Sequence, residues 1–335
     1  MKKDHIYFLG VGGIGMSALA RFFKHEKWHV AGYDRTCSAL TRQLEKEGID
    51  IHYEDGVELI PKSFLDKDRC VVVYTPAVPN DLKEKCHFEN NGFEMLKRSE
   101  MLGLLSEGKF VIAVAGTHGK TTTSTLVTFI EDRVNQKGSA FLGGISKNYD
   151  SNLRLSEDNL VTLEADEFDR SFLRLKPDVA VVTAADADHL DIYGTHEKVK
   201  EAFSDFISLI KKGGCLIIKN GVDVKIKNKD ISVYRYAVEE KADFFADNIR
   251  LTEDGCPFFD VTTPFGKIEN CRLGIPGTVN IENATAAIAA YICASKKSGE
   301  ECNTQQLLLA LREFSGVKRR FDVHVNTPKA IYIDD

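Results

Sequence analysis

The chain has 335 residues, of which 43% are hydrophobic, and this length and composition predict two domains rather than one. The formal net charge of −6 excludes sequence-independent binding to nucleic acid, which needs a basic face. The eight cysteines form no C-x-x-C pair and no apolar run reaches transmembrane length, so we expect a cytoplasmic protein that is not inserted in a membrane.

The first predicted elements are a strand at His5–Leu9, a glycine-rich turn and a helix at Met16–His25. A second strand, Val30–Asp34, ends in an acid at about the distance expected for a ribose-binding carboxylate in a dinucleotide fold. Glycines let backbone N–H groups approach a diphosphate, but they do not recognise the attached nucleoside. The pattern therefore predicts a diphosphate site and leaves a dinucleotide and a UDP-sugar both open. The turn consists of Gly10, Val11, Gly12, Gly13, Ile14 and Gly15.

Two further strands are expected in this Rossmann-like α/β region, at Cys70–Thr75 and around Phe93–Met95. The segment Ser99–Gly108 then leads into a second domain.

The second domain opens with an apolar strand, Phe110–Ala115, that runs into the loop G-T-H-G-K-T-T. Strand, glycine loop and helix in this order are typical of a nucleoside triphosphate site. Lys120 would neutralise the β- and γ-phosphates of ATP, and the Thr121 hydroxyl would ligate the accompanying Mg²⁺. Only the shorter G-x-x-G-K-T form is present, because Val114 stands five residues before Gly119.

Acidic residues follow the next predicted strands. Leu160–Asp169 begins as an apolar run and contains Glu164, and Asp178–Thr183 leads to His189, which lies between acids. A carboxylate at the carboxyl end of a parallel strand faces the same crevice as Thr121, and divalent cations such as Mg²⁺ prefer oxygen ligands. We therefore expect an α/β domain with a metal and ATP site. The segment Ile231–Arg272 alternates β-prone runs with turn signals and predicts a small antiparallel sheet at its edge.

Taken together, these segments resemble the Mur ligase family of peptidoglycan precursor synthesis, and within it the alanine-adding branch. The resemblance spans the whole chain. The motifs that carry it are G-x-G-G-x-G-M at Gly10–Met16, G-T-H-G-K-T-T at Gly116–Thr122, E-A-D-E-x-D at Glu164–Asp169, D-H-L-D at Asp188–Asp191, P-G-x-x-N-x-x-N at Pro276–Asn283, R-R-F at Arg319–Phe321 and the final D-D.

The resemblance implies an ATP-dependent ligase that joins L-alanine to the carboxylate of UDP-N-acetylmuramate through an acyl phosphate. It implies catalytic roles for Lys120, His189 and Arg320. One Mg²⁺ would be bound by Thr121 and Glu164, and a second by His189. The implied ATP-binding residues are Gly116, Thr117, His118, Gly119, Lys120, Thr121, Thr122, Asn280, Asn283, Arg320 and Asp335. The implied substrate-binding residues are Gly10, Gly12, Gly13, Ile14, Gly15, Asp34, Thr75, Pro76 and Ala77.

The resemblance also implies a division into a UDP-sugar-binding domain (1–108), a central ATP-binding domain (109–317) and the start of a third domain (318–335). That third domain would select the amino acid, and the strand Lys329–Ile333 would be its first. We therefore expect a fragment that is inactive alone. Val279 stands where family members usually have histidine, and Ser204 lies near the place where several relatives carry a carbamylated lysine.

Three alternatives remain open at this point. The nearest is a recycling ligase that joins a tripeptide to the same sugar nucleotide. A nicotinamide-dependent oxidoreductase would explain Gly10–Asp34 but would leave Lys120, Glu164 and His189 without a role. A non-catalytic nucleotide-binding module would explain a missing third domain but not the metal-site residues. The sequence leaves the oligomeric state undecided, with a homodimer among the options.

Overall fold

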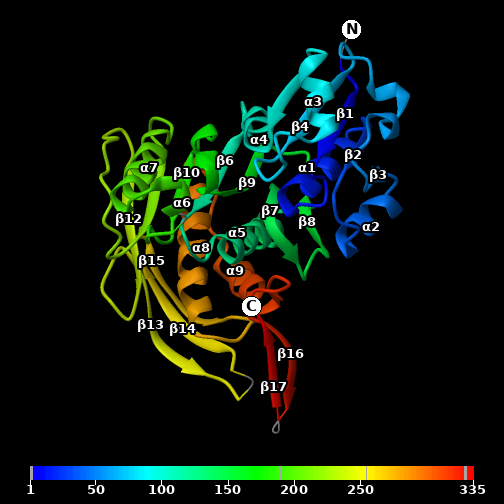
Figure 1. Ribbon diagram of the computed structural model, residues 1–335. Coiled ribbons are helices and arrows are strands. Elements are labelled where there is room, and N and C mark those ends of the chain that lie inside the picture. The colour runs from blue at the N-terminus through cyan, green and yellow to red at the C-terminus, as the bar shows by residue number, and fades with distance from the viewer. Residues whose placement is uncertain (1–2, 189, 254, 328–329) are drawn as a thin grey trace. The chain divides into compact units, whose positions relative to one another are not determined.

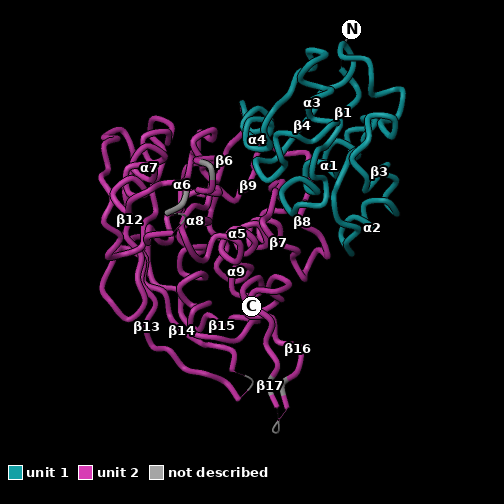
Figure 2. Tube along the Cα trace, in the orientation of Figure 1, with its two compact units in different colours: residues 1–107 teal, residues 108–335 magenta. Residues whose placement is uncertain are grey.

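The computed structural model describes residues 3–188, 190–253, 255–327 and 330–335. The chain divides into two compact units, residues 1–107 and residues 108–335 (Figure 2). Within the described residues, no helix combines the length and the apolar character needed to span a bilayer.

Unit 1 is built on a five-stranded parallel sheet with the order β3-β2-β1-β4-β5 (Figure 1). The strands are β1 His5–Leu9, β2 His29–Tyr33, β3 Asp50–His52, β4 Cys70–Tyr74 and β5 Glu94–Lys97. The helices are α1 Ile14–His25, α2 Ala39–Lys46, α3 Lys83–Asn90 and α4 Arg98–Ser106, with short 3₁₀ turns at η1 Val57–Leu59 and η2 Lys62–Phe64. The chain order reverses between β1 and β4, which makes this pair of strands the switch point where ligands bind in such sheets.

Unit 2 is built on a ten-stranded sheet with the order β15-β14-β13-β12-β11-β10-β6-β9-β7-β8. Its strands are β6 Phe110–Ala115, β7 Ser139–Ser146, β8 Ser151–Arg154, β9 Leu160–Ala165, β10 Val179–Val182, β11 Cys215–Lys219, β12 Ser232–Val238, β13 Phe244–Leu251, β14 Pro257–Thr263 and β15 Gly266–Arg272. Its helices are α5 Lys120–Asn135, α6 Leu190–Tyr193, α7 His196–Ser208, α8 Val279–Ser298 and α9 Thr304–Glu313, with a 3₁₀ segment η3 Phe168–Arg174.

The crossovers of unit 2 leave its middle in opposite directions. From β6 the chain passes through α5 to β7 on one side, and from β10 it passes through α7 to β11 on the other. Because such crossovers are right-handed, α5 and α7 lie on opposite faces of the sheet. The neighbouring strands β6 and β10 therefore flank the switch point of this unit.

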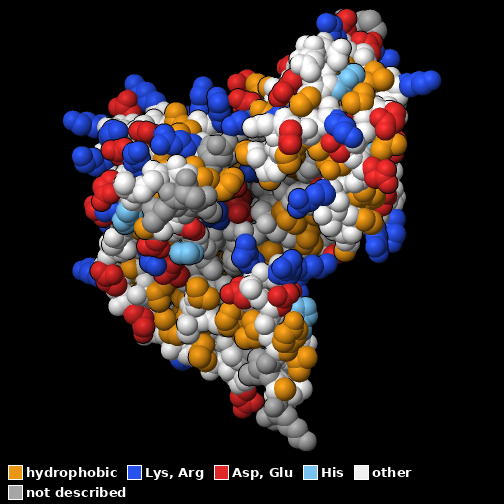
Figure 3. Space-filling view, in the orientation of Figure 1, with side chains coloured by type: hydrophobic (Ala, Val, Ile, Leu, Met, Phe, Trp, Pro, Cys, Tyr) orange, Lys and Arg blue, Asp and Glu red, His pale blue; other side chains and the backbone are white. Residues whose placement is uncertain are grey.

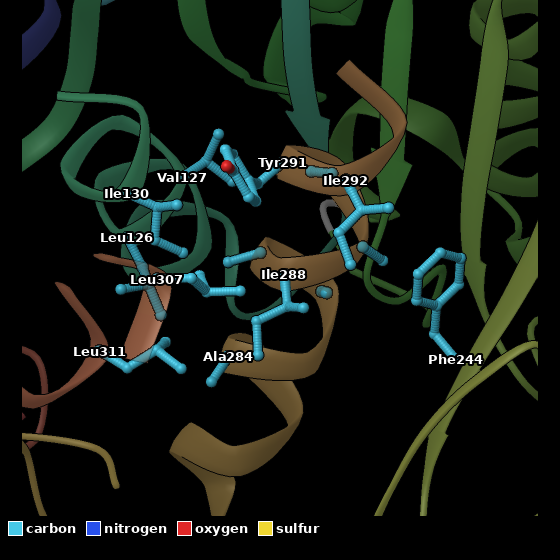
Figure 4. Packing of buried hydrophobic residues seen from close by; sticks show 14 of the residues in the cluster. Leu126, Val127, Ile130, Phe244, Ala284, Ile288, Tyr291, Ile292, Leu307 and Leu311 are labelled. Carbon is cyan, nitrogen blue, oxygen red and sulfur yellow. The ribbon is translucent and has the colours of Figure 1, made fainter. Parts of the chain in front are cut away.

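The core of unit 2 lies between the sheet and the helices α5, α8 and α9 (Figure 4). Ile288 and Tyr291 of α8 pack beside Leu126 and Ile130 of α5, and Leu307 of α9 belongs to the same cluster. Helix α8 is buried over most of its length, and the small side chains of its alanines permit close packing. This packing fixes the direction of α5, which begins at the glycine loop.

The predicted elements are present, with differences at their ends. Helix α1 begins at Ile14 rather than Met16, because the backbone N–H of Ser17 already donates to the carbonyl of Gly13. In the segment expected to form a small antiparallel sheet, β13, β14 and β15 are antiparallel and extend the main sheet at its edge. Strand β12 pairs in parallel with both β11 and β13.

The chain's last elements form an antiparallel hairpin of β16 (Asp322–Thr327) and β17 (Ala330–Asp334). Its β17 corresponds to the strand expected at Lys329–Ile333, of which residue 329 lies outside the described residues. Lys147, directly after β7, holds the hairpin through an ion pair of 2.7 Å with Asp322. The Tyr332 side chain of the hairpin is 58% exposed to solvent. Figure 3 shows apolar side chains gathered on the hairpin. On the face drawn there, charged side chains of both signs are interspersed over each unit.

Candidate active site

The glycine loop of unit 2 begins where β6 ends, at the switch point. Gly116 has φ +139°, and a Cβ atom there would collide with the Thr183 hydroxyl, which follows β10. Thr183 Oγ1 donates to the carbonyl of Ala115 at 3.2 Å and to that of His118. Gly119 has φ +77° and stands immediately before α5. Glycine is required at both positions because neighbouring atoms approach its Cα closely and because other residues rarely adopt its backbone conformation.

The Lys120 ammonium is held by two groups of the protein. Its Nζ donates to the carbonyl of Gly116 at 2.6 Å and to Glu167 Oε1 at 3.0 Å, and it lies 2.9 Å from Glu167 Oε2. The Glu167 side chain is only 1% exposed, and its backbone carbonyl accepts from the hydroxyl of Tyr193 in α6 at 2.6 Å. An ammonium has three donors, so this arrangement leaves Lys120 one for a phosphate oxygen. The lysine is therefore positioned before any ligand arrives.

Thr121 and Glu164 form the expected oxygen pair. Thr121 Oγ1 donates to Glu164 Oε1 at 3.1 Å, and the backbone N–H of Gly143 donates to Glu164 Oε2 at 3.0 Å. Burial raises the pKa of Glu164, while nearby Lys120 and the Thr121 hydrogen bond act in the opposite direction. A divalent cation at this place would offset the cost of burying the carboxylate, and a hydroxyl beside a carboxylate is a donor set that suits Mg²⁺. The residues present therefore fit such an ion.

The loop borders a cavity of about 280 Å³ that also reaches the start of α8 and the final residues of the chain. Asn280 and Asn283 are 3% and 7% exposed, and Asn283 Nδ2 donates to Asn280 Oδ1 at 3.2 Å. Asn283 Oδ1 accepts from the Thr123 hydroxyl at 3.3 Å, which ties α8 to α5. The cavity is lined by Thr117, His118, Gly119, Lys120, Thr121, Thr122, Glu164, Val279, Asn280, Asn283, Arg320, Phe321 and Asp335.

Arg320 and Asp335 reach this cavity although they lie far along the chain from the glycine loop. The backbone N–H of Phe321 donates to Asp335 Oδ1 at 3.0 Å, so the two ends of the hairpin are joined at the cavity. The N–H of Lys318 donates to the carbonyl of Ile145 at the end of β7. Two of the separate sequence motifs, R-R-F and the final D-D, are therefore brought to the ATP-type loop.

The sequence also marks His189, Val279 and Ser204. His189 lies outside the described residues. Val279 is 56% exposed at the mouth of the cavity. Ser204 is buried in α7 and donates to the carbonyl of Lys225 at 2.6 Å, so it forms part of the packing of α7 rather than of the glycine-loop cavity. Among the described residues, no group of three or more His, Cys, Asp or Glu side chains forms a metal cluster.

Unit 1 carries a second glycine loop at its own switch point. Gly10 has φ +85°, and a Cβ there would lie 3.0 Å from Cγ2 of Thr75, which follows β4. The N–H of Gly12 donates to Asp34 Oδ2 at 2.7 Å, and the N–H of Thr36 donates to Asp34 Oδ1 at 2.9 Å. The structure thus brings together the glycine loop, Asp34 and the start of the Thr75–Ala77 turn. In both units a glycine after the central strand meets a threonine after its neighbour.

Sequence reasoning gave no role to Glu167, Gly143 or Thr183. Glu167 belongs to the E-A-D-E-x-D motif, so its acid was visible, but its pairing with Lys120 depends on how η3 folds back. Gly143 and Thr183 contribute through close contacts with Glu164 and Gly116, and no motif marks them. Only the spatial arrangement of β7 and β10 identifies these two residues.

Comparison with known proteins identifies both units. Residues 5–110 match the model of the Mur ligase family catalytic domain, and residues 114–291 match that of the Mur ligase middle domain. The UDP-N-acetylmuramate–L-alanine ligase of Parabacteroides distasonis is 47% identical over 337 residues, covering 100% of this chain and 71% of the relative. This chain belongs to the Mur ligase family.

Other members of the family agree with this assignment. The UDP-N-acetylmuramate–L-alanine ligase of Porphyromonas gingivalis is 45% identical, over 98% of this chain and 72% of its own length. The crystal structure of the UDP-N-acetylmuramate–alanine ligase MurC from Thermotoga maritima superposes with a TM-score of 0.84 at 26% identity, over 99% of this chain and 74% of that one. Mur ligases are ATP-dependent ligases, so the family implies ATP as a cofactor.

Proposed function

We propose that this chain carries the sugar-nucleotide and ATP sites of a ligase that joins L-alanine to UDP-N-acetylmuramate. The observation that carries the proposal is the arrangement of Lys120, Thr121 and Glu164 at the switch point of unit 2. The second glycine loop, in unit 1, and the 47% identity to a relative bearing this activity support it. An oxidoreductase would not need the Lys120 site.

ATP is assigned to the 280 Å³ cavity, with its phosphates at the glycine loop. The N-terminus of α5 and the remaining donor of Lys120 would meet the β- and γ-phosphates. Asn280 and Asn283 are assigned to adenine, because an amide donates to N7 and accepts from the N6 amino group together. Their amide groups retain donors and lone pairs beyond the hydrogen bonds of α8. Arg320 is assigned to the phosphates and Asp335 to the ribose.

Magnesium is assigned to Thr121 and Glu164, whose oxygens fit the ion, and a second ion to His189 on the basis of the sequence. When bound, Mg²⁺ would neutralise charge on the phosphates. In the proposed reaction the muramyl carboxylate attacks the γ-phosphorus, which releases ADP and leaves an acyl phosphate. The amine of L-alanine then attacks the acyl carbon, forms the amide and releases inorganic phosphate and a proton. Lys120 and Arg320 would reduce the repulsion between carboxylate and triphosphate, both of which are anions.

The diphosphate of UDP-N-acetylmuramate is assigned to the Gly10–Gly15 loop, with Asp34 and Thr75–Ala77 near the uridine. We further propose the functional division 1–108, 109–317 and 318–335, with the β16–β17 hairpin beginning the part that selects the amino acid. The enzyme would work in the cytoplasm, where reduced cysteines are usual.

A calorimetric titration with UDP-N-acetylmuramate, beside a parallel titration with NAD, tests the proposal. Binding of the sugar nucleotide alone is expected, and binding of NAD alone would overturn the assignment of unit 1. A ligation assay on a ligase that also carries the complete third domain, following ADP release with L-alanine or with a tripeptide acceptor, then separates the alanine ligase from the recycling ligase. Faster turnover with the tripeptide would favour the recycling enzyme.

A further inference from the structure

Arg98 lies against the glycine loop of unit 1. It is the first residue of α4, directly after β5, and α4 packs against α1. A Cβ atom on Gly15 would lie 2.6 Å from Arg98 Nη1, 2.9 Å from Cδ and 3.1 Å from Cζ. The guanidinium therefore rests directly on the backbone of the last glycine of the loop, at the first turn of α1. A side chain at position 15 would require Arg98 to move.

The charge of this arginine is notable because the loop itself has none. The segment from Gly10 to Ser17 contains no basic or acidic residue. The acid nearest to the loop, Asp34, accepts from the backbone of Gly12 at 2.7 Å and adds negative charge beside it. Backbone N–H groups and a helix N-terminus supply only partial positive charge to a diphosphate. The full positive charge of Arg98, placed beside Gly15, would compensate the negative charges of both the diphosphate and Asp34.

We propose that Arg98 binds the diphosphate of the sugar nucleotide. The planar guanidinium can donate two parallel hydrogen bonds to phosphate oxygens, which a lysine ammonium cannot. Both the end of its apolar stem and the guanidinium lie against Gly15, at the carboxyl edge of the sheet beside the switch point of β1 and β4. The inference rests on the proposed function, because it takes UDP-N-acetylmuramate as the ligand of unit 1.

The test compares three ligands across matched variants. Wild type, Arg98→Met and Arg98→Lys are titrated calorimetrically with UDP-N-acetylmuramate and UDP, and uridine binding is followed by ligand-observed NMR. Methionine keeps an apolar stem over Gly15 and removes the charge. Arg69→Ala is the control, because Arg69 pairs with Asp4 at 2.6 Å before β4 and β1, at the opposite edge of the same sheet.

Arg98→Met is expected to weaken UDP-N-acetylmuramate and UDP by the same factor, about 10- to 100-fold, as a charged hydrogen bond predicts. Uridine binding should be unchanged, and the affinity of the variant for UDP should depend less on salt. The affinity of Arg98→Lys for both ligands should lie between those of Arg98→Met and wild type, and the affinity of Arg69→Ala should match that of wild type. Should Arg98→Met fail to fold, the loss of UDP affinity in Arg98→Lys decides.

Two results would overturn the inference alone: unchanged affinity of Arg98→Met for UDP, or an equal loss for uridine, which would show a packing role only. Failure of the wild-type chain to bind UDP-N-acetylmuramate would instead overturn the proposed function itself, and the inference with it.

Discussion

Lys120 Nζ lies 2.9 Å from the carboxylate of Glu167, a side chain that is almost entirely buried. The same ammonium donates to the carbonyl of Gly116 at 2.6 Å, so the protein itself occupies two of its three donors. This arrangement holds the lysine at the glycine loop in advance, which lowers the entropy that must be lost when phosphate binds. It also sets Glu167 in competition with the phosphates for the lysine charge.

The first prediction concerns Lys120 itself. Lys120→Ala should abolish ligation, because it removes a positive charge at the phosphates that is worth roughly 3 to 4 kcal/mol of barrier on the usual scale for such groups. The measurement is ADP release with UDP-N-acetylmuramate and L-alanine, made with the substitution placed in a ligase that also carries the complete third domain. Lys241→Ala, at an exposed position of the same unit, is the control and should retain activity. Ligation by Lys120→Ala at the wild-type rate would contradict the assignment.

The second prediction tests two roles of Glu167: it stabilises the folded protein by pairing with Lys120, and it competes with the phosphates for the Lys120 charge. Glu167→Gln should lower the free energy of unfolding by about 1 to 3 kcal/mol without nucleotide, because the mostly buried ammonium of Lys120 loses its anionic partner. MgATP should then raise the thermal midpoint of the variant more than that of wild type, since the phosphates replace the lost charge. Equal shifts on MgATP addition would show that Glu167 and the phosphates do not compete for Lys120.

Much of this site could be predicted from the sequence because its motifs are local. The order of strand, glycine loop and helix identifies Lys120 and Thr121, and the acid after the next strand identifies Glu164. The relation of Asn283 to Thr123, and of Asp335 to Phe321, joins segments that lie far apart in sequence. The resemblance implied that these residues share a site, whereas residue patterns alone did not.

What could not be predicted depends on tertiary packing. Thr183 contacts Gly116 only because β10 lies beside β6, and Arg98 covers Gly15 only because α4 packs against α1. Strand order is set by long-range burial, which a local pattern does not encode. The parallel pairing of β12 was missed for the same reason, since its alternating residues are equally compatible with an antiparallel edge.

The third prediction is a pH dependence that arises in α5. Burial raises the pKa of Glu131 to about 7 from a reference value of 4.5, and its side chain is 3% exposed. The folded state therefore binds this proton more strongly than the unfolded state. The contribution of Glu131 to stability is fully present below pH 4.5 and is lost as the pH rises through about 7.

Glu131→Gln should remove the loss of stability that Glu131 causes as the pH rises. The difference in unfolding free energy between variant and wild type should grow between about pH 4.5 and pH 7, up to about 3 kcal/mol. Urea denaturation at several pH values measures it. Glu201→Gln, at an exposed position of α7, should show no such growth. Parallel curves for wild type and Glu131→Gln would mean that Glu131 does not titrate in this range.

The fourth prediction concerns Asp34, the acid that a dinucleotide fold would offer to a ribose. Here its two oxygens accept from the backbone N–H groups of Gly12 and Thr36, at 2.7 and 2.9 Å. Asp34→Ala leaves both N–H groups without this acceptor and frees the loop to move. Because a hydrogen bond to a charged group contributes about 1.5 to 3 kcal/mol, affinity for UDP-N-acetylmuramate should fall by about 10- to 100-fold.

Asp34→Asn tests the reason for that loss. Its amide has a single oxygen, so it can accept from one of the two N–H groups, and its affinity for UDP-N-acetylmuramate should lie between those of Asp34→Ala and wild type. MgATP binding is the internal control, because the described lining of the cavity assigned to ATP belongs to unit 2. If both variants bound the sugar nucleotide as wild type does, Asp34 would have no part in holding the loop. If both lost MgATP binding as well, the effect would be one on folding. Selective loss of the sugar nucleotide, graded from asparagine to alanine, is expected because the carboxylate acts on the loop geometry.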